Sequence, residues 1–386
     1  MERAELNDGI FRDAFTEELP TDYAPNPGVP DGSIKTAISL FSGGGGLDIG
    51  IEAAGFRTLA CIEKDANACE TLEYNQSRYF SHADVINASV TDVDVKALMG
   101  KLGIRKGELD LLFGGPPCQT FSQIGKKDGL GDERGRLLFA MVDYAKALMP
   151  KAIVIENVKG LKSARSVDGT PGGIVMDLTR QLEKLGYLVS SKVLDSSLYG
   201  VAQKRQRLFI VAIKREFGTF EFPAPTVDKH RVTTVGEVIS ALPAHVRKGM
   251  APLHENHIDV TPDGDIRRIS YVVEGLHLAK MADAPPEIKG RLGPKDTTKF
   301  LRLSRTKPSN TLRCGEIFFH PLEDRYLTPR EYMRIHGFPD DYVLRGPIRG
   351  RSGTVKNLDQ HRLVANSVPP AVGRAVGLAV LSQITR

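Results

Sequence analysis

The chain has 386 residues, of which 41% are hydrophobic and 26% are charged, and its 52 Lys and Arg exceed its 47 Asp and Glu by five. This composition is ordinary for a globular protein and excludes wholesale disorder, and the length fits two domains or one large domain with an insertion. Because no run of about eighteen apolar residues occurs, we expect no membrane span. The polar, acidic start predicts no secretory signal.

The charge is unevenly distributed along the chain. Residues 1–33 hold eight acidic and two basic residues, a net charge of −6, so the other 353 residues carry 50 bases against 39 acids, or +11. Four prolines within residues 20–33 indicate a linker. We therefore expect an acidic, Pro-rich arm over residues 1–34, and the basic remainder is a weak indication of a polyanionic partner.

Short apolar segments alternate with helical patterns from residue 37 to residue 213. The segments that indicate strands are 37–41, 59–63, 109–113, 152–156, 188–194 and 208–213. Helical patterns begin near residue 66 and cover residues 136–148 and 174–185. This alternation predicts an α/β fold with a Rossmann-like, doubly wound and mostly parallel sheet over residues 35–215.

The alternation stops after residue 214. Residues 215–307 are rich in Pro, Lys, Arg and His, and they hold five of the nine histidines. We predict a smaller, irregular domain over residues 216–354, with long surface loops bearing solvated charge as the alternative. Residues 355–386 contain a helical pattern at 370–384 and are expected to return to the core of the first domain.

The four cysteines stand at positions 61, 69, 118 and 314, without a C-x-x-C pair. This spacing is neither that of a zinc site nor that of a disulfide framework, and it suits a reducing cytosol. We therefore expect a cytoplasmic protein with no metal site.

A glycine loop, F-S-G-G-G-G-L-D at residues 41–48, follows the first predicted strand and opens a helix. No register of it fits the dinucleotide fingerprint G-x-G-x-x-G. Glu63 ends the second strand, where a ribose diol would lie, and Asp84 stands near the end of a third, suited to an adenine amine. The loop favours a nucleoside cofactor without a pyrophosphate over NAD, with a tight structural turn as the alternative.

A second loop, G-G-P-P-C-Q-T-F-S at residues 114–122, follows the strand at 109–113, at the sheet edge where ligands bind. Cys118 can be a nucleophile there if backbone N–H groups or a cation stabilise its thiolate. An isolated cysteine is more often a small core residue, but the flanking prolines and Gln119 do not favour burial.

Two further motifs carry charge beside apolar strands. Glu156, in I-E-N-V, ends the strand at 152–156, where desolvation favours a protonated carboxyl that can donate a proton; an N-cap or surface acid is the alternative. Lys204, Arg205 and Arg207 precede the strand at 208–213 and can bind a phosphate or a polarised carbonyl oxygen, unless they form a solvated turn.

Taken in order, these motifs resemble those of the DNA (cytosine-5) methyltransferase family, short prokaryotic type. The resemblance continues with L-T-P-R-E…R-I-H-G-F-P at residues 327–339 and N-S-V-P-P at 366–370. Six motifs in the order and spacing of the family are very specific. The chain departs from the pattern in its four consecutive glycines, in Pro116, where Phe is common, and in Ala365, where Gly is usual.

The resemblance implies methyl transfer from S-adenosylmethionine to C5 of a cytosine that is flipped out of duplex DNA. The Cys118 thiolate would add to C6 of the base, and Glu156 would hydrogen-bond N3. Arg207, together with Arg205, would contact the O2 side and position the other two groups. S-adenosylhomocysteine would be the product.

The resemblance also implies which residues contact the ligands. Those expected against the cofactor are Phe41, Ser42, Gly43, Gly46, Leu47, Glu63, Lys64, Asp84, Val85, Gly115, Pro117, Leu137, Asn366, Ser367 and Val368. Those expected against DNA are Gln119, Ser122, Gln203, Arg302, Arg305 and Lys307. The last three lie in the segment where the family keeps its target-recognition domain.

The implied role is sequence-specific methylation of double-stranded DNA in restriction-modification or another phage-defence system, by a monomer that acts at the nucleoid. Alternatives are an RNA (tRNA) cytosine-5 methyltransferase, a catalytically silent DNA-binding protein and a nicotinamide-dependent oxidoreductase. The sizeable variable segment favours DNA by analogy. The intact Cys118, Glu156 and Arg207 argue against silence, and the failed fingerprint argues against the oxidoreductase.

Overall fold

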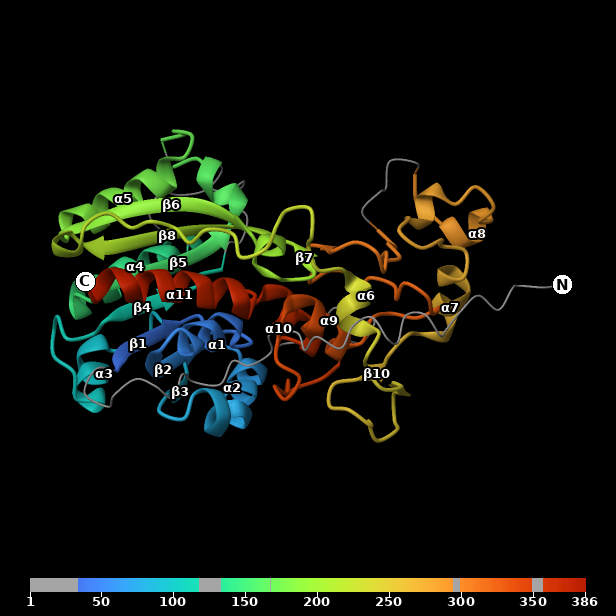
Figure 1. The fold of residues 1–386 in the computed structure, drawn as a ribbon, viewed down its shortest axis with the longest axis horizontal. Coiled ribbons are helices and arrows are strands. Elements are labelled where there is room, and N and C mark those ends of the chain that lie inside the picture. Colours follow the sequence, from blue (N-terminus) through green and yellow to red (C-terminus); the bar gives the residue numbers. More distant parts are fainter. Residues whose placement is uncertain (1–33, 118–132, 167, 294–298, 349–356) are drawn as a thin grey trace.

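The structure, a computed structural model, describes residues 34–117, 133–166, 168–293, 299–348 and 357–386. Its centre is a seven-stranded sheet in the order β3-β2-β1-β4-β5-β8-β6 (Figure 1). The strands of this sheet are β1 (Lys35–Leu40), β2 (Phe56–Glu63), β3 (Asp84–Asn87), β4 (Leu111–Gly114), β5 (Ala152–Val158), β6 (Tyr187–Asp195) and β8 (Gln206–Lys214). The helices nearest to it are α1 (Gly46–Ala53), α2 (Ala66–Tyr79), α3 (Val95–Leu102), α4 (Glu133–Leu148), α5 (Gly173–Lys184), α10 (Gln360–Asn366) and α11 (Pro370–Ile384). The prediction of a doubly wound α/β sheet is confirmed.

The strand directions locate the ligand-binding edge of the sheet. Strands β1 to β5 pair in parallel, and β8 is antiparallel to both of its neighbours. The chain builds outward from β1 through β2 and β3, and then returns to add β4 on the other side of β1. Ligands of such sheets bind at this reversal, outside the carboxyl ends of the strands. In this protein those ends are Leu40 and Gly114.

Both faces of the sheet are buried, since successive residues of a strand point to opposite faces. Ala37 and Val154 pack on one face with α1 and α11. Their chain neighbours Ile38 and Ile153 pack on the other face with α3, α4 and α5. All four side chains are fully buried, so helices and sheet form three layers around an apolar core.

Glycines allow α1 and α11 to pack in close contact. A Cβ atom at Gly50 would lie 2.4 Å from the carbonyl oxygen of Pro370, and one at Gly377 would lie 2.7 Å from Cβ of Ala54. The stretch Gln360–Ile384 is, within the described residues, long and apolar enough to cross a membrane, but 67% of its most apolar window is buried. Its hydropathy is therefore that of a core helix.

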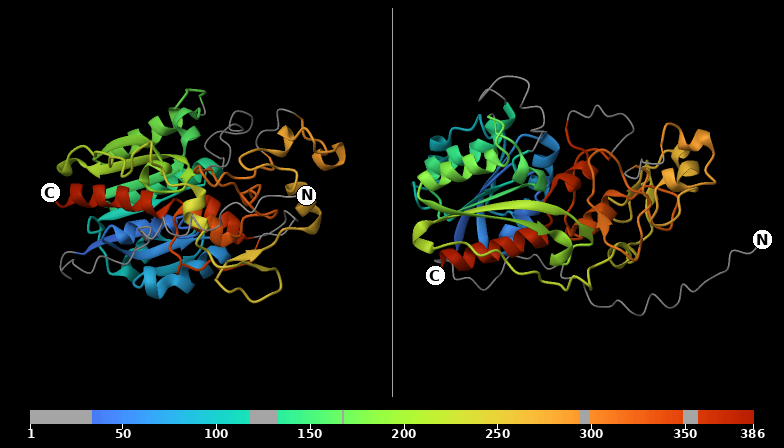
Figure 2. Two further views of the ribbon diagram at one scale, coloured as in Figure 1. Left: turned by 45° about the vertical axis from the view of Figure 1, so that its right-hand side comes forward. Right: turned by 90° about the horizontal axis from the view of Figure 1, so that it is seen from above.

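The part of the chain between residues 215 and 348 contains only short elements. These are α6 (Val235–Ile239), α7 (Asp263–Ile269), α8 (Pro286–Lys289), α9 (Pro329–His336), β9 (Val246–Arg247), β10 (Ile258–Asp259) and β11 (Ser309–Asn310), the last paired with β7 (Gln203–Lys204). Figures 1 and 2 show α9 and α10 between α11 and the segment that carries α6 to α8. One buried cluster joins Leu72 to Tyr332 and Tyr342. Packing is thus continuous between the two halves. The domain boundaries expected near residues 215 and 354 stay predictions.

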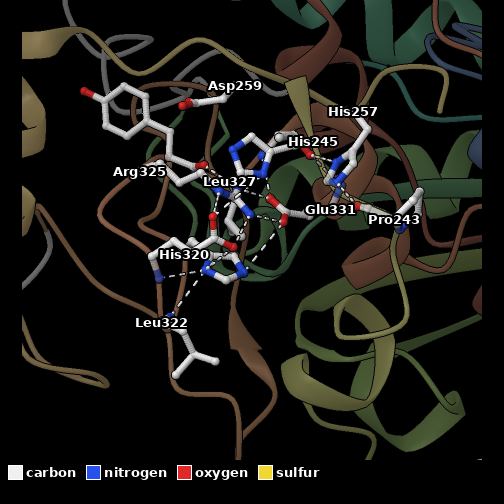
Figure 3. A network of polar contacts seen from close by, with 12 residues as sticks. Pro243, His245, His257, Asp259, His320, Leu322, Arg325, Leu327 and Glu331 are labelled. Carbon is white, nitrogen blue, oxygen red and sulfur yellow. Dashed lines mark hydrogen bonds and ion pairs between the residues drawn. The ribbon is translucent and has the colours of Figure 1, made fainter. Parts of the chain in front are cut away.

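A buried charged network stabilises this second half (Figure 3). Arg325 donates hydrogen bonds of 2.8 and 2.7 Å to the two carboxylate oxygens of Glu331. Burial raises the pKa of Glu331, but the hydrogen bonds and charge of Arg325 outweigh burial and hold the pKa below its usual value. Burial lowers the pKa of the adjacent His320 to about 4, and His257 bonds Thr328, which N-caps α9, at 2.8 Å. Buried ion pairs thus lie beside the apolar clusters of this half.

Candidate active site

Four segments of the chain meet at the carboxyl edge of the sheet. The glycine loop follows β1, Glu63 ends β2, a loop follows β4 at Gly114, and Glu156 lies near the end of β5. The register of β4 with β5 pairs Gly114 with Ile155, the residue before Glu156. The topology thus brings the predicted cofactor and catalytic motifs to one edge.

The glycine loop is wedged against the junction of α10 and α11. A Cβ atom at Gly44 would lie 2.9 Å from Oγ of Ser367, and one at Gly46 would lie 2.3 Å from the carbonyl oxygen of Val368. Gly43 differs, since its φ is +54° and a Cβ atom there would meet nothing nearer than 4.0 Å. The backbone of Gly43 is therefore accessible to a ligand, while its neighbours are fixed by packing.

Glu63 is held at the end of β2 by backbone N–H groups. Its Oε2 accepts a hydrogen bond of 2.9 Å from Gly43, and its Oε1 accepts bonds of 2.8 Å from Lys64 and Asp65. Burial nevertheless raises the pKa of this carboxyl. Nearby Phe41 has a φ of +58°, a strained conformation for a residue with a side chain, and such strain is concentrated at functional sites. A fixed carboxylate beside an open glycine backbone suits the hydroxyls of a ribose.

The base of the loop after β4 is fixed against β5. Asn157 donates a hydrogen bond of 3.0 Å from Nδ2 to the carbonyl oxygen of Pro116. A Cβ atom at Gly115 would lie 3.2 Å from Oε2 of Glu156, so a side chain there would crowd the carboxylate. The next residues, 118–132, lie outside the described part of the chain, and the roles of Cys118, Gln119 and Ser122 stay predictions.

Glu156 and Arg207 form an ion pair at this edge. The Glu156 residue is 7% exposed, and its Oε1 lies 3.1 Å from Nε of Arg207. Burial raises the pKa of Glu156, while the charges of Arg207 and Arg205 oppose that rise. Because burial favours the protonated form of this carboxyl group and the two arginines favour the charged form, the group can carry a proton or release it to a neighbouring ring nitrogen.

Arg205 is a buried cation behind that pair. It is 1% exposed, and its Nη2 donates a hydrogen bond of 3.0 Å to the carbonyl oxygen of Ser367. Burial and the charge of Arg207 lower the pKa of Arg205 to about 9. The same carbonyl lies 2.9 Å from Nε2 of His336, and burial lowers the pKa of that ring. The neutral ring therefore donates from Nε2, and the side chains of Arg205 and His336 together fix the backbone at Ser367.

Two of the six residues expected to contact DNA have structural roles instead. Gln203 is fully buried, and its Oε1 accepts a hydrogen bond of 3.0 Å from the N–H of Leu312. Arg302 is 5% exposed; its guanidinium donates to the carbonyl oxygen of Ile269 at 2.9 Å and pairs with Asp324. Buried polar groups require such partners, and neither side chain is available to read a base. The sequence alone does not reveal this burial.

Arg305 and Lys307 are exposed, as a contact to DNA requires. Their carbonyl oxygens accept hydrogen bonds of 2.8 and 3.0 Å from Gly236 and Val235 at the start of α6. The Arg305 side chain also lies 3.6 Å from Glu274. The backbone of this segment is thus anchored while both cations face solvent.

The remaining residues expected at the cofactor differ in exposure. Pro117, Lys64 and Asn366 are exposed, Leu137 is half-buried, and Ser42, Leu47, Ser367 and Val368 are buried. Ser42 donates its hydroxyl to Oγ of Ser39, and Ser367 donates to the carbonyl oxygen of Leu363, each at 2.7 Å. The buried serines thus stabilise the loop and its support.

Asp84 and Val85 lie at the other end of their strand, and their expected place at the cofactor is wrong. Strand β3 starts at Asp84, and its register pairs Asn87, the last residue, with Glu63 at the edge. The Asp84 carboxylate forms a 2.9 Å ion pair with Lys101 instead. Asn87 holds the position assigned to Asp84 and donates to the carbonyl oxygen of Glu63 at 3.2 Å.

Asn157 and His336 lie within the motifs, but the sequence alone predicts no role for either residue. For Asn157, the available signal was its place as a short polar residue at the end of an apolar strand. Nothing in the sequence indicates that His336 reaches Ser367. Among the described residues, no group of three or more His, Cys, Asp or Glu could hold a metal ion.

The fold is that of solved methyltransferases. The structure resembles one described as a DNA modification methyltransferase encoded within a prophage (E. coli), with a TM-score of 0.67, 20% identity, and coverage of 91% of this chain and 100% of that one. It also resembles the Dnmt2 methyltransferase of S. pombe, with a TM-score of 0.59, 16% identity, and coverage of 91% and 100%.

The family model for C-5 cytosine-specific DNA methylases matches residues 35–382, and the chain belongs to that family. It is 32% identical to the Type II methyltransferase M.PspPI of Psychrobacter sp. (strain TA137), covering 100% of this chain and 86% of the relative. It is 31% identical to M.Eco47II of Escherichia coli, covering 90% and 79%. The protein is thus a DNA (cytosine-5)-methyltransferase, related to Type II restriction-modification enzymes.

Proposed function

We propose that the protein methylates one cytosine within a specific sequence of double-stranded DNA, using S-adenosylmethionine, in a restriction-modification or other phage-defence system. The observation that carries this proposal is the cluster of Glu156 with Arg207 and Arg205, which Asn157 ties to the base of the P-C-Q loop. The cluster lies at the strand reversal, beside the open glycine backbone, so a base and a nucleoside cofactor can meet there.

The described residues fit S-adenosylmethionine, a nucleoside cofactor that has no pyrophosphate. Glu63 would accept hydrogen bonds from the ribose hydroxyls, and the backbone of Gly43 would allow close approach. Phe41 and the exposed Asn366 would border the cofactor on two sides. When bound, the cofactor supplies an electrophilic methyl group on a sulfonium.

The chain's own residues would activate the base. The Cys118 thiolate adds to C6, which makes C5 nucleophilic. Glu156 donates a hydrogen bond or a proton to N3, so that negative charge does not build up on the ring. Arg207 contacts O2 and holds Glu156 in place, and loss of the C5 proton later releases Cys118. Because a stacked base exposes neither C6 nor N3 to these groups, the cytosine must leave the helix.

Residues 216–354 are proposed as the target-recognition domain. Arg305 and Lys307 would contact phosphates, since both are exposed on an anchored backbone. The enzyme would act as a monomer on chromosomal DNA in the cytoplasm.

Bisulfite sequencing of DNA from cells that express the full chain tests this proposal. We expect complete protection of cytosine within one short sequence, and none in cells that express Cys118→Ser at the same level. An unmethylated genome in cells that contain the folded, soluble protein would overturn the proposal. Methylation found in tRNA instead would favour the RNA alternative.

A further inference from the structure

Cys314 lies on the segment that leaves β11, and this segment is held against the strand that precedes Arg205. Strand β11 pairs in parallel with β7, so Ser309 lies opposite Gln203 and Asn310 opposite Lys204. The hydroxyl of Thr311 then donates a hydrogen bond of 2.9 Å to the carbonyl oxygen of Lys204. These bonds hold the segment against the Q-x-R-x-R strand.

The Cys314 thiol touches the motif expected at the cofactor. Its sulfur donates a hydrogen bond of 2.8 Å to Oδ1 of Asn366. Cys314 is partly exposed and Asn366 is exposed, so solvent reaches this contact. Asn366 is followed by Ser367, whose carbonyl oxygen accepts from Arg205. Thiol and guanidinium are therefore attached to adjacent residues.

Arg205 is an incompletely paired cation at this place. Its Nε and Nη1 are buried and have no hydrogen-bond partner among the described residues. Buried N–H groups of a charged side chain are costly without an acceptor, so these atoms are ready to bind an anion. Negative charge on Cys314 is felt by Arg205, whose pKa it raises against the lowering effect of burial. The positive charge of Arg205 would thus stabilise an anionic form of the Cys314 sulfur.

We propose that Cys314 is a second reactive thiol of the active site, and that its reversible oxidation by hydrogen peroxide switches off cofactor binding. The loss of cofactor binding rests on the proposed function, whereas the reactivity of the thiol does not. The thiolate sulfur attacks one peroxide oxygen, an S–O bond forms as the O–O bond breaks, and hydroxide leaves. The sulfur is oxidised to a sulfenic acid and the peroxide is reduced.

The oxidised sulfur would disturb the cofactor edge. In a sulfenic acid the donor is an O–H group one S–O bond beyond the sulfur, and the added oxygen needs room where sulfur and Oδ1 are 2.8 Å apart. Asn366 must then turn away from its position at the cofactor. A small thiol attacks the sulfenic sulfur, so that an S–S bond forms, the S–O bond breaks and water leaves. A second thiol molecule then attacks this mixed disulfide, releases the Cys314 thiol and leaves as the oxidised small disulfide.

The other two described cysteines serve as internal controls. Cys61 is fully buried, and burial raises its pKa well above the usual value. Cys69 is 3% exposed, and burial raises its pKa to about 12. Since the thiolate is the reacting form, neither should react at a rate close to that of Cys314.

The test uses the full chain with Cys118→Ser, which removes the predicted nucleophile. The protein is treated with hydrogen peroxide and dimedone, a trap for sulfenic acids, and its peptides are measured by mass spectrometry. We expect the Cys314 peptide to be labelled at least tenfold faster than the Cys61 and Cys69 peptides. Equal labelling of the three, or no label on Cys314, would overturn the proposal.

A second measurement tests the consequence for the cofactor. Calorimetry of S-adenosylmethionine binding to the Cys118→Ser chain should show at least tenfold weaker affinity after oxidation, with recovery after treatment with dithiothreitol. The Cys118→Ser/Cys314→Ser chain should keep its affinity through the same treatment. Unchanged affinity of a labelled protein would refute the switch. Absence of binding before oxidation would instead count against the proposed function and leave the labelling result intact.

Discussion

The two halves of the molecule reach a fixed structure by different physical means. In the sheet half, strands such as β1 and β5 bury apolar side chains on both faces, and Ile38 and Val154 are fully buried. In the half between residues 215 and 348, the longest described helix has eight residues, and Arg330 and Glu331 are among its buried side chains. Apolar burial tolerates small changes of shape, whereas a buried charge fails when its partner is lost. The sheet half is thus stabilised mainly by apolar packing, whereas the second half adds buried ion pairs to its apolar clusters.

Glu156→Gln should have the largest effect, because it changes the chemistry of the sheet half without changing its packing. Glutamine cannot supply a proton to N3, so kcat should fall by about 10²–10⁴-fold, while DNA affinity stays within a factor of three. Single-turnover methylation and filter binding measure the two. Glu183→Gln, at an exposed position of α5, is the matched control. A rate within tenfold of the parent enzyme would remove Glu156 from the mechanism.

Arg325→Met should unfold the charged half most readily. The change removes the two hydrogen bonds that Arg325 donates to the Glu331 carboxylate, which is 2% exposed. Loss of one partner of a buried pair costs about 3–5 kcal/mol, and urea unfolding measures it. Arg180→Met, which breaks an exposed pair with Asp177, should cost less than about 1 kcal/mol. Similar losses for the two variants would mean that the charged network does not stabilise this half.

Asp48→Asn should stabilise the protein in a pH-dependent way. Burial raises the pKa of Asp48 to about 6, well above the usual value of an aspartate, so the folded state binds a proton that the unfolded state releases. The unfolding free energy of the parent chain should therefore fall as pH rises from about 4 to 6, and the variant lacks this loss. Above pH 7 the variant should be more stable by on the order of 1–3 kcal/mol.

Urea midpoints between pH 4.5 and 8 measure this difference. Asp143→Asn, on the exposed side of α4, is the control. A constant difference between Asp48→Asn and the parent at all pH values would show that Asp48 does not titrate in this range.

Arg305→Ala and Lys307→Ala should have the smallest effects, and only on DNA. Each lost phosphate contact should reduce the slope of log affinity against log salt by about one, with kcat unchanged. Fluorescence anisotropy over a salt series measures the slope, and Lys184→Ala at the end of α5 is the control. An unchanged slope in the double variant would place the phosphate contacts elsewhere.

Patterns of apolar residues predicted the fold well, because the central strands, such as β4, β5 and β8, are buried on both faces. The same reasoning placed Asp84 at the wrong end of β3, since a four-residue strand carries no signal of where it begins. The prediction that Gln203 and Arg302 contact DNA failed for a different reason. A sequence shows that a side chain is polar or charged, but it does not show whether that side chain is buried. Tertiary contacts decide such cases, and they appear only when distant segments meet.

The unusual run of four glycines has a physical reason that only the structure gives. A Cβ atom at Gly45 would lie 2.5 Å from the hydroxyl of Tyr342, and one at Gly44 would lie 3.0 Å from the carbonyl oxygen of Leu363. A larger residue at either position would require the support to move. Departures from a motif are thus compensated by neighbours that are remote in sequence.

The support of the glycine loop by Ser367 and Val368 also has a consequence during synthesis. The loop leaves the ribosome early, but its supporting residues follow more than three hundred positions later. At a synthesis rate of about 5–20 residues per second, the loop waits for roughly 15 to 60 seconds. A chain released early therefore cannot form the cofactor site, so unfinished molecules would not modify the genome.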